Sequence, residues 1–398
     1  MRQEITLAGE SRNRGTGMNF AGMDFASTTW HAVRGLLAGQ NVYTDSTRIA
    51  GVMAWPAGEH VPATLSWQAP FAALPLWAGF FAFDFVSIAA IWAAVFILTR
   101  PRSPLAILGA ACCGAFAIIL GGGTWTLILG QPPAFELLGV ALLVRSRRPW
   151  VGALGFLLAA STFQTGVPLA VMLVVLSAWP VVWRGALLVA ALSVPPIVLG
   201  VIATGGLVRY TQVFSQGAFG HLAALPGEPL GYADQPHRID LGALLHRVGI
   251  SSAAVQVGAG LLVLAVALIF LTRLPAALRR LDYPPVLCLV MAVTILCTYH
   301  QPYDLLLVAG AVVPVVLMAG ERSMEMLGIV AAAGISVAVF KDAPVAAILD
   351  PVCLLAMATL SALAARQGAA RLVTRDSQGP MNSELTSTGD AVADGLVS

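Results

Sequence analysis

Long apolar stretches, which recur from about residue 79 to residue 365, constrain this chain more than any other feature. Inside a bilayer every backbone N–H and C=O group must be satisfied internally, so stretches of roughly 20 apolar residues span as helices. Only 11% of the residues are charged, whereas soluble domains are about a quarter charged. We therefore predict an all-α polytopic membrane protein, a bundle of about eleven transmembrane or re-entrant helices. The expected segments are 79–99, 104–121, 126–144, 151–163, 165–180, 185–204, 250–272, 284–299, 305–320, 325–340 and 343–365.

Two neighbouring segments, 151–163 and 165–180, are short for a membrane crossing. They meet at the polar stretch 161–166. Broken helices at membrane depth are tolerated where they line protein or a water-filled cavity. We therefore expect a broken or re-entrant hairpin here.

Arginines fall at alternate ends of the expected segments, and the positive-inside rule makes these ends cytoplasmic. They are Arg100, Arg102, Arg145, Arg147, Arg148, Arg184, Arg273, Arg279, Arg280, Arg322 and Arg366. With eleven segments the chain then starts outside and ends inside. A polar N-terminus outside the membrane requires either a missing first helix, which we favour, or translocation by the helix that follows.

The composition along the chain suggests four regions. Residues 1–17 are expected to be disordered, and residues 18–68 to form an extracytoplasmic loop with a short helix. Residues 69–366 form the transmembrane domain, with an outer loop at 205–249. The tail 367–398 is rich in Ser, Thr, Gly and Asp and is expected to be disordered and cytoplasmic.

Several kinds of function lack support in the sequence. A net charge of +2 implies no large basic surface for nucleic acid. The five cysteines lie in apolar stretches without CxxC or His-paired spacing, so neither a disulfide framework nor a zinc site is indicated. GxxxxGK[ST], HExxH, DxD and GxSxG motifs do not occur. We expect no metal and no cofactor.

The expected outer ends of the spans hold the rare polar side chains, which are costly at membrane depth and usually mark pathways or sites. We expect these side chains, together with two from the first loop, to face one outer cavity. The set is Asp24, His31, Gln131, Gln164, Tyr299, His300, Gln301, Tyr303 and Asp304.

Each of these residues also has a purely structural interpretation. Asp24 would suit the N-terminus of a helix, where a carboxylate complements the dipole. Gln131 would suit an interhelical hydrogen bond, and His300 a satisfied histidine at the interface. Glu136 and Asp84 lie within expected spans and are interpreted as paired structural groups.

Four stretches resemble glycosyltransferase family 87. DFASTTWHAVRGLLAGQNVYT is similar to the family's first outer loop, with Asp24 ahead of a short helix and Gly39–Tyr43 at its end. WQAPFAALPLWAGFFAFDFVSIAAIW resembles the proline-rich entry into a span. LILGQPPAFELLGVALLVRSRRPWVGALGFLLAASTFQTGVPLAVML is similar to the Gly-Gln element and the helix pair that follows it. CTYHQPYDLLLVAG resembles the late aromatic–His segment.

The resemblance implies a GT-C-like bundle and a mannosyltransferase that depends on a polyprenyl-phosphate sugar. The sugar, most simply mannose, would pass with inversion to a lipid or glycan acceptor on the outer face of a bacterial plasma membrane. Asp24 would be the general base. His300, Gln131, Gln164, Tyr299 and Tyr303 would bind the donor phosphate, helped by Lys341 or an arginine of 205–247, while His31, Tyr43 and Asp304 would be acceptor or auxiliary residues. The chain departs from the family in lacking its first helix and a lysine near Gln164.

Two other classes remain open. A transporter or flippase for a lipid-linked or amphipathic solute also uses broken helices and polar groups at mid-membrane, but it needs polar groups on both sides of its barrier. A non-catalytic membrane scaffold needs no outer polar cluster, and would be favoured if Asp24 lay far from His300.

Overall fold

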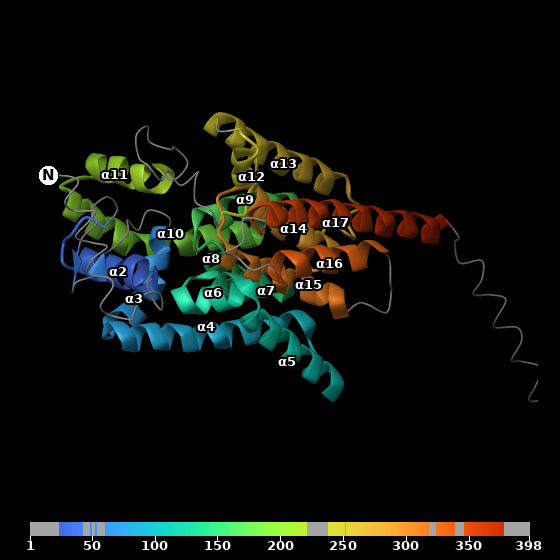
Figure 1. Cartoon of the computed structure of the whole chain (residues 1–398), viewed down its shortest axis with the longest axis horizontal. Helices are drawn as coiled ribbons and strands as arrows, with labels where there is room; N and C mark the ends of the chain where they lie inside the picture. Colours follow the sequence, from blue (N-terminus) through green and yellow to red (C-terminus); the bar gives the residue numbers. More distant parts are fainter. Residues whose placement is uncertain are drawn as a thin grey trace, which may run out of the picture.

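A computed structural model describes most of the chain as a long helical bundle (Figure 1). The described residues are 24–42, 48–49, 52–53, 60–220, 238–250, 252–317, 324–338 and 346–377. Within these ranges the only strands are Arg48–Ile49 and Val52–Met53, which form one short antiparallel pair.

The helices differ widely in length. The long ones are α4 (Leu76–Thr99), α10 (Trp179–Thr204), α13 (Ala253–Arg273) and α17 (Ala346–Ser377). Shorter helices complete the bundle: α5 (Pro104–Ile119), α6 (Gly121–Leu129), α7 (Pro133–Arg145), α8 (Pro149–Ala159), α9 (Phe163–Val175), α14 (Pro284–Cys297), the 3₁₀ turn η4 (Pro302–Asp304), α15 (Leu305–Leu317) and α16 (Met324–Ala338). The remaining elements are η1 (Phe25–Trp30), α2 (His31–Leu37), α3 (Pro62–Ala73), α11 (Leu207–Gly220) and α12 (Leu241–Arg247).

The chain is an all-α, multi-pass membrane protein. Within the described ranges four helices are long and apolar enough to cross a bilayer, and the number is five if α5 and α6, which are bent by 60° at their junction, count as one span. Large apolar side chains such as Phe81, Phe85 and Leu105 project from the bundle surface, as a lipid surrounding requires. The expected count of eleven spanning or re-entrant segments is not confirmed, because several of the helices are short.

The break between α6 and α7 divides the segment 126–144, which we expected to be continuous. Gly130 ends α6 in the left-handed conformation, at φ 73°, and Pro133 begins α7. A left-handed glycine after a helix and a proline in the first turn are the usual stop and start signals. Gln131 therefore lies in a turn between two helices rather than within one.

The expected break between 151–163 and 165–180 is present as the gap between α8 and α9. The Thr162 hydroxyl caps α9 by accepting a hydrogen bond from the backbone N–H of Thr165. Backbone groups of this gap also bind the segment before α3, because Val61 N donates to Ser161 O at 3.2 Å and Thr64 Oγ1 donates to the same oxygen at 2.7 Å.

The short helix expected in the stretch 18–68 is present as η1 and α2, and α3 begins in the same stretch. Two regions that we expected to be loop or tail also contain helices. The stretch 205–249 holds α11 and α12. The last helix, α17, continues to Ser377, so residues 367–377 are not part of a disordered tail. Ala, Leu and Arg in this stretch are strong helix formers and extend the helix beyond its apolar part. The N-terminal region 1–17 lies outside the described residues.

Helix α14 lies at the centre of the bundle and positions the segment that follows it. Its residues from Pro284 to Leu296 are buried, against α9, α13, α15 and α17. In Figure 1, α2, α3 and α11 lie at one end of the bundle, while α17 extends beyond the other end. The short segment between α14 and α15 carries the buried residues Tyr299, His300 and Asp304.

Candidate functional site

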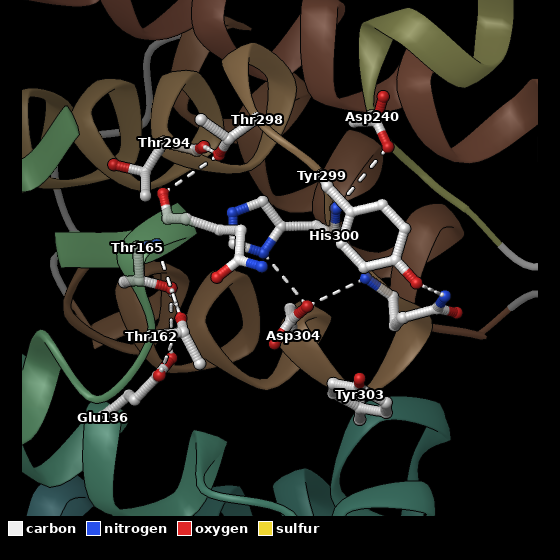
Figure 2. Close-up of polar contacts among 12 residues, drawn as sticks. Glu136, Thr162, Thr165, Asp240, Thr294, Thr298, Tyr299, His300, Tyr303 and Asp304 are labelled. Atoms are coloured by element: carbon white, nitrogen blue, oxygen red, sulfur yellow. Dashed lines mark hydrogen bonds and ion pairs between the residues drawn. The ribbon is translucent and has the colours of Figure 1, made fainter. Parts of the chain in front are cut away.

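A small polar hollow lies where the α6–α7 turn, the start of α9 and the segment between α14 and α15 meet (Figure 2). Six of the residues singled out from the sequence line it: Gln131, Gln164, Tyr299, His300, Tyr303 and Asp304. Its empty space amounts to ≈ 340 Å³, but only ≈ 20 Å³ is wide enough for the centre of a water molecule. In this conformation it holds about one water.

His300 and Asp304 form a buried pair at this hollow. His300 Nδ1 lies 3.0 Å from Asp304 Oδ2, and Gln301 N donates to the same oxygen at 2.8 Å. An ionised carboxylate only accepts hydrogen bonds, so Nδ1 carries the proton and Nε2 offers a lone pair when the ring is neutral. Nε2 has no hydrogen-bond partner among the described residues. One nitrogen of His300 is therefore held by Asp304, and the other is available to a ligand. An interfacial histidine with a purely structural role would have partners for both nitrogens.

Glu136, which the sequence suggests is a paired structural group, lines the hollow. Its carboxyl group is 1% exposed and accepts hydrogen bonds from Thr162 Oγ1 at 3.3 Å and from Thr165 Oγ1 at 3.2 Å. Its partners are therefore these two hydroxyls, and within the described chain no cation forms an ion pair with it. The other expected pairing is wrong, because Asp84 Oδ1 has no hydrogen-bond partner among the described residues.

Asp24 is joined to the hollow through Gln131. Gln131 Nε2 donates to Asp24 Oδ2 at 2.6 Å, although Asp24 itself is not a lining residue. Burial raises the pKa of Asp24 above its usual value of 3.8, and the hydrogen bond from Gln131 partly lowers it. A carboxylate with a raised pKa is a stronger base, provided that it is ionised at the working pH.

The backbone after Asp24 is a π-helix, Phe25–Trp30, which continues directly into α2. Such turns are rare and frequent at functional sites. The Phe25 ring is fully buried between Phe80 and Phe83 of α4, and Trp30 Nε1 donates to Leu74 O at 2.9 Å. Packing on α3 and α4 therefore fixes the position of Asp24.

His60 is a lining residue that sequence reasoning missed. Its side chain is 2% exposed, and neither ring nitrogen has a hydrogen-bond partner among the described residues. Burial lowers the pKa of His60 from 6.5 to about 4, so the ring is neutral at physiological pH. Its position depends on backbone pairing with Thr162, about a hundred residues later in the chain, and no local pattern signals such a contact.

A buried ion pair lies behind the segment of His300. Arg238 and Asp240 form a two-pronged contact, with Arg238 Nη2 at 2.7 Å from Asp240 Oδ1. Ile239 N donates to His300 O at 3.1 Å, and the Arg238 guanidinium lies 5.0 Å from the centre of the Tyr299 ring. One arginine of the stretch 205–247 is therefore adjacent to a lining residue.

The remaining predicted residues lie elsewhere. His31 is buried beside Trp30, with ring centres 5.2 Å apart, and does not line the hollow. Tyr43 and Lys341 lie outside the described residues. The described ranges contain no group of three His, Cys, Asp or Glu side chains placed to hold a metal ion.

Comparisons with models of protein families, with curated proteins and with solved structures find no match for this chain. The resemblance to glycosyltransferase family 87 therefore stays a hypothesis, and function must be argued from the site itself.

Proposed function

We propose that this protein is a membrane glycosyltransferase. In this proposal a sugar, most simply mannose, moves from a polyprenyl-phosphate donor to a lipid or glycan acceptor on the extracytoplasmic side. One observation carries the proposal: the 2.6 Å hydrogen bond from Gln131 to Asp24 joins the predicted base to the hollow that six other predicted residues line.

The reaction requires one proton acceptor. As the acceptor oxygen attacks the anomeric carbon, its O–H proton passes to Asp24, and the bond between that carbon and the donor phosphate oxygen breaks. The electron pair of this bond leaves with the polyprenyl phosphate, so the sugar inverts its configuration. The leaving group is already a stable anion and needs no general acid, but it needs positive or hydrogen-bonding groups.

The apolar surroundings support a lipid-linked donor. An open groove runs between α5, α15 and α16, with ≈ 340 Å³ wide enough for the centre of a water molecule, and its lining includes Phe116, Leu120, Ala309 and Val313. Ala309 follows Asp304 by five residues on the same helical stretch, which corresponds to about 7.5 Å along the helix. A hydrocarbon chain in this groove would bring its head group near the polar hollow.

The direct test is transfer of label. Membranes that contain the full chain are incubated with polyprenyl-phosphate mannose labelled in the sugar, together with a lipid extract, and lipid products are separated. Label in a new glycolipid that depends on this protein is expected. Accumulation of unchanged donor on the other side of sealed vesicles, without any new product, would instead indicate the transporter or flippase.

A further inference from the structure

The charges around the hollow bear on which part of a substrate it holds. Two acidic side chains, Glu136 and Asp304, line it, and the other polar lining groups are amides, hydroxyls and imidazoles. Among the described residues no Lys or Arg lines it. A phosphate placed here would lie beside two acidic side chains, with no described Lys or Arg in the lining to balance its charge in a medium of low dielectric constant.

The unsatisfied atoms around the hollow match a different ligand. His300 Nε2, both nitrogens of His60 and Gln164 Oε1 are buried without a hydrogen-bond partner in the described chain. Buried polar atoms without partners are costly and rare in native proteins. Together with the Glu136 carboxylate they present both donors and acceptors, which is what a ring with several hydroxyl groups requires.

We propose that the hollow lined by Glu136, Asp304, His60, His300 and Gln164 is a subsite for an uncharged polyhydroxylated ring, that is, for the sugar itself. This inference rests on the proposed glycosyl transfer and corrects one part of the sequence expectation, because these groups then hold the sugar rather than the donor phosphate.

Two features of the chemistry agree with this placement. Positive charge develops at the anomeric carbon in the transition state of glycosyl transfer, and a carboxylate beside the sugar stabilises it. Sugar hydroxyls also replace the Thr162 and Thr165 hydroxyls that Glu136 now binds. Because the hollow holds about one water, the ring must displace side chains, and the His60 ring breaks no internal hydrogen bond when it moves.

Binding of simple sugars to the purified full chain in lipid nanodiscs tests the subsite without requiring transfer. The probes are methyl hexopyranosides at millimolar concentration, followed by saturation-transfer NMR, with inorganic phosphate as the competing anion. We expect a methyl hexoside to bind the wild type. Glu136→Gln should weaken this binding at least about tenfold, because the amide replaces an acceptor oxygen by a donor and a hydrogen bond lost in a buried site costs about that much in affinity.

Matched variants separate binding from folding. Asp84→Asn removes a carboxylate of α4 that does not line the hollow, and it should leave hexoside affinity unchanged. His60→Phe is the second variant if Glu136→Gln fails to fold, and it should also weaken binding. Inorganic phosphate at equal concentration should not displace the hexoside.

The subsite is refuted if no hexoside binds the wild type, if affinity is unchanged in the folded variants, or if phosphate competes. The proposed reaction fails separately. Hexoside binding without any label transfer would overturn glycosyl transfer and leave the subsite standing, whereas transfer at the wild-type rate in Glu136→Gln would overturn the subsite alone.

Discussion

The substitution Asp24→Asn tests the role of the predicted base most directly. Asparagine has nearly the same shape as aspartate, but its amide cannot take up the proton of the acceptor hydroxyl. Removal of a general base typically lowers the rate by about 10²–10⁴-fold. We therefore expect kcat for label transfer to fall at least about 100-fold, which corresponds to about 2.7 kcal/mol of transition-state free energy.

The structure predicts that folding survives this change. Asp24→Asn loses the charge-assisted character of the 2.6 Å hydrogen bond from Gln131, at a cost of about 1–3 kcal/mol. It also removes a carboxylate whose ionised form burial disfavours, as the raised pKa of Asp24 shows, and this offsets part of that cost. The midpoint of thermal unfolding should therefore change little.

The assay is transfer of labelled mannose in membranes with matched amounts of wild type, Asp24→Asn and Asp84→Asn. Asp84→Asn is the control, because it removes another carboxylate from the first half of the chain without touching Gln131. More than a tenth of the wild-type kcat in a well-inserted Asp24→Asn protein would show that Asp24 is not the base. An equal loss in both variants would point to a structural role of buried carboxylates.

Three further changes test the surroundings of this site. Because the pKa of Asp24 is raised, the rate of transfer should fall on the acid side of the pH profile at a pH above 3.8. Gln131→Met should move this acidic fall to a higher pH, since the substitution removes the hydrogen bond that lowers the pKa of Asp24. An unchanged acidic fall in this variant would exclude Asp24 as the titrating group. Burial lowers the pKa of His60 from 6.5 in the unfolded chain to about 4 in the folded protein. The free energy of unfolding should therefore be highest above pH 6.5 and should decrease by about 3 kcal/mol as the pH falls toward 4. The midpoint of thermal unfolding of His60→Gln should depend less on pH over this range. Gly130→Ala should lower both the midpoint of thermal unfolding and kcat, because the residue has φ 73° and an added Cβ would lie 2.5 Å from Phe25 Cβ. A variant with wild-type activity and stability would contradict this geometry.

The helices followed from the sequence because their apolar runs are long and the bilayer allows few alternatives. The breaks were harder to place. The sequence LGQPP contains both a helix stop and a helix start. The mean hydropathy of about 20 residues around it is nevertheless high, so 126–144 looks like one continuous apolar segment. The helix α11 and the start of α3 were missed for another reason: they are polar or mixed in composition, and a search for apolar runs does not detect them.

The hollow was predictable in part. Polar side chains are so costly in this surrounding that those at segment ends were good candidates, and six of them do meet. Glu136 lies within an expected span and was interpreted as a paired structural group, and only the structure shows that its partners are two threonine hydroxyls and that it lines the hollow. His60 depends on contacts with Ser161 and Thr162, and a contact across such a sequence distance leaves no trace in one sequence.

The connection between the base and the hollow depends on one glycine. Gly130 ends α6 in the left-handed backbone conformation, which residues other than glycine rarely adopt. Because glycine has no Cβ, Phe25 can approach it closely. Phe25 directly follows Asp24, and Gln131 directly follows Gly130, so this single close contact sets the distance across which Gln131 reaches the carboxylate. A substitution at Gly130 would therefore separate two side chains that it does not itself touch. For this reason Gly130→Ala should impair transfer even though the alanine adds no polar group and removes none.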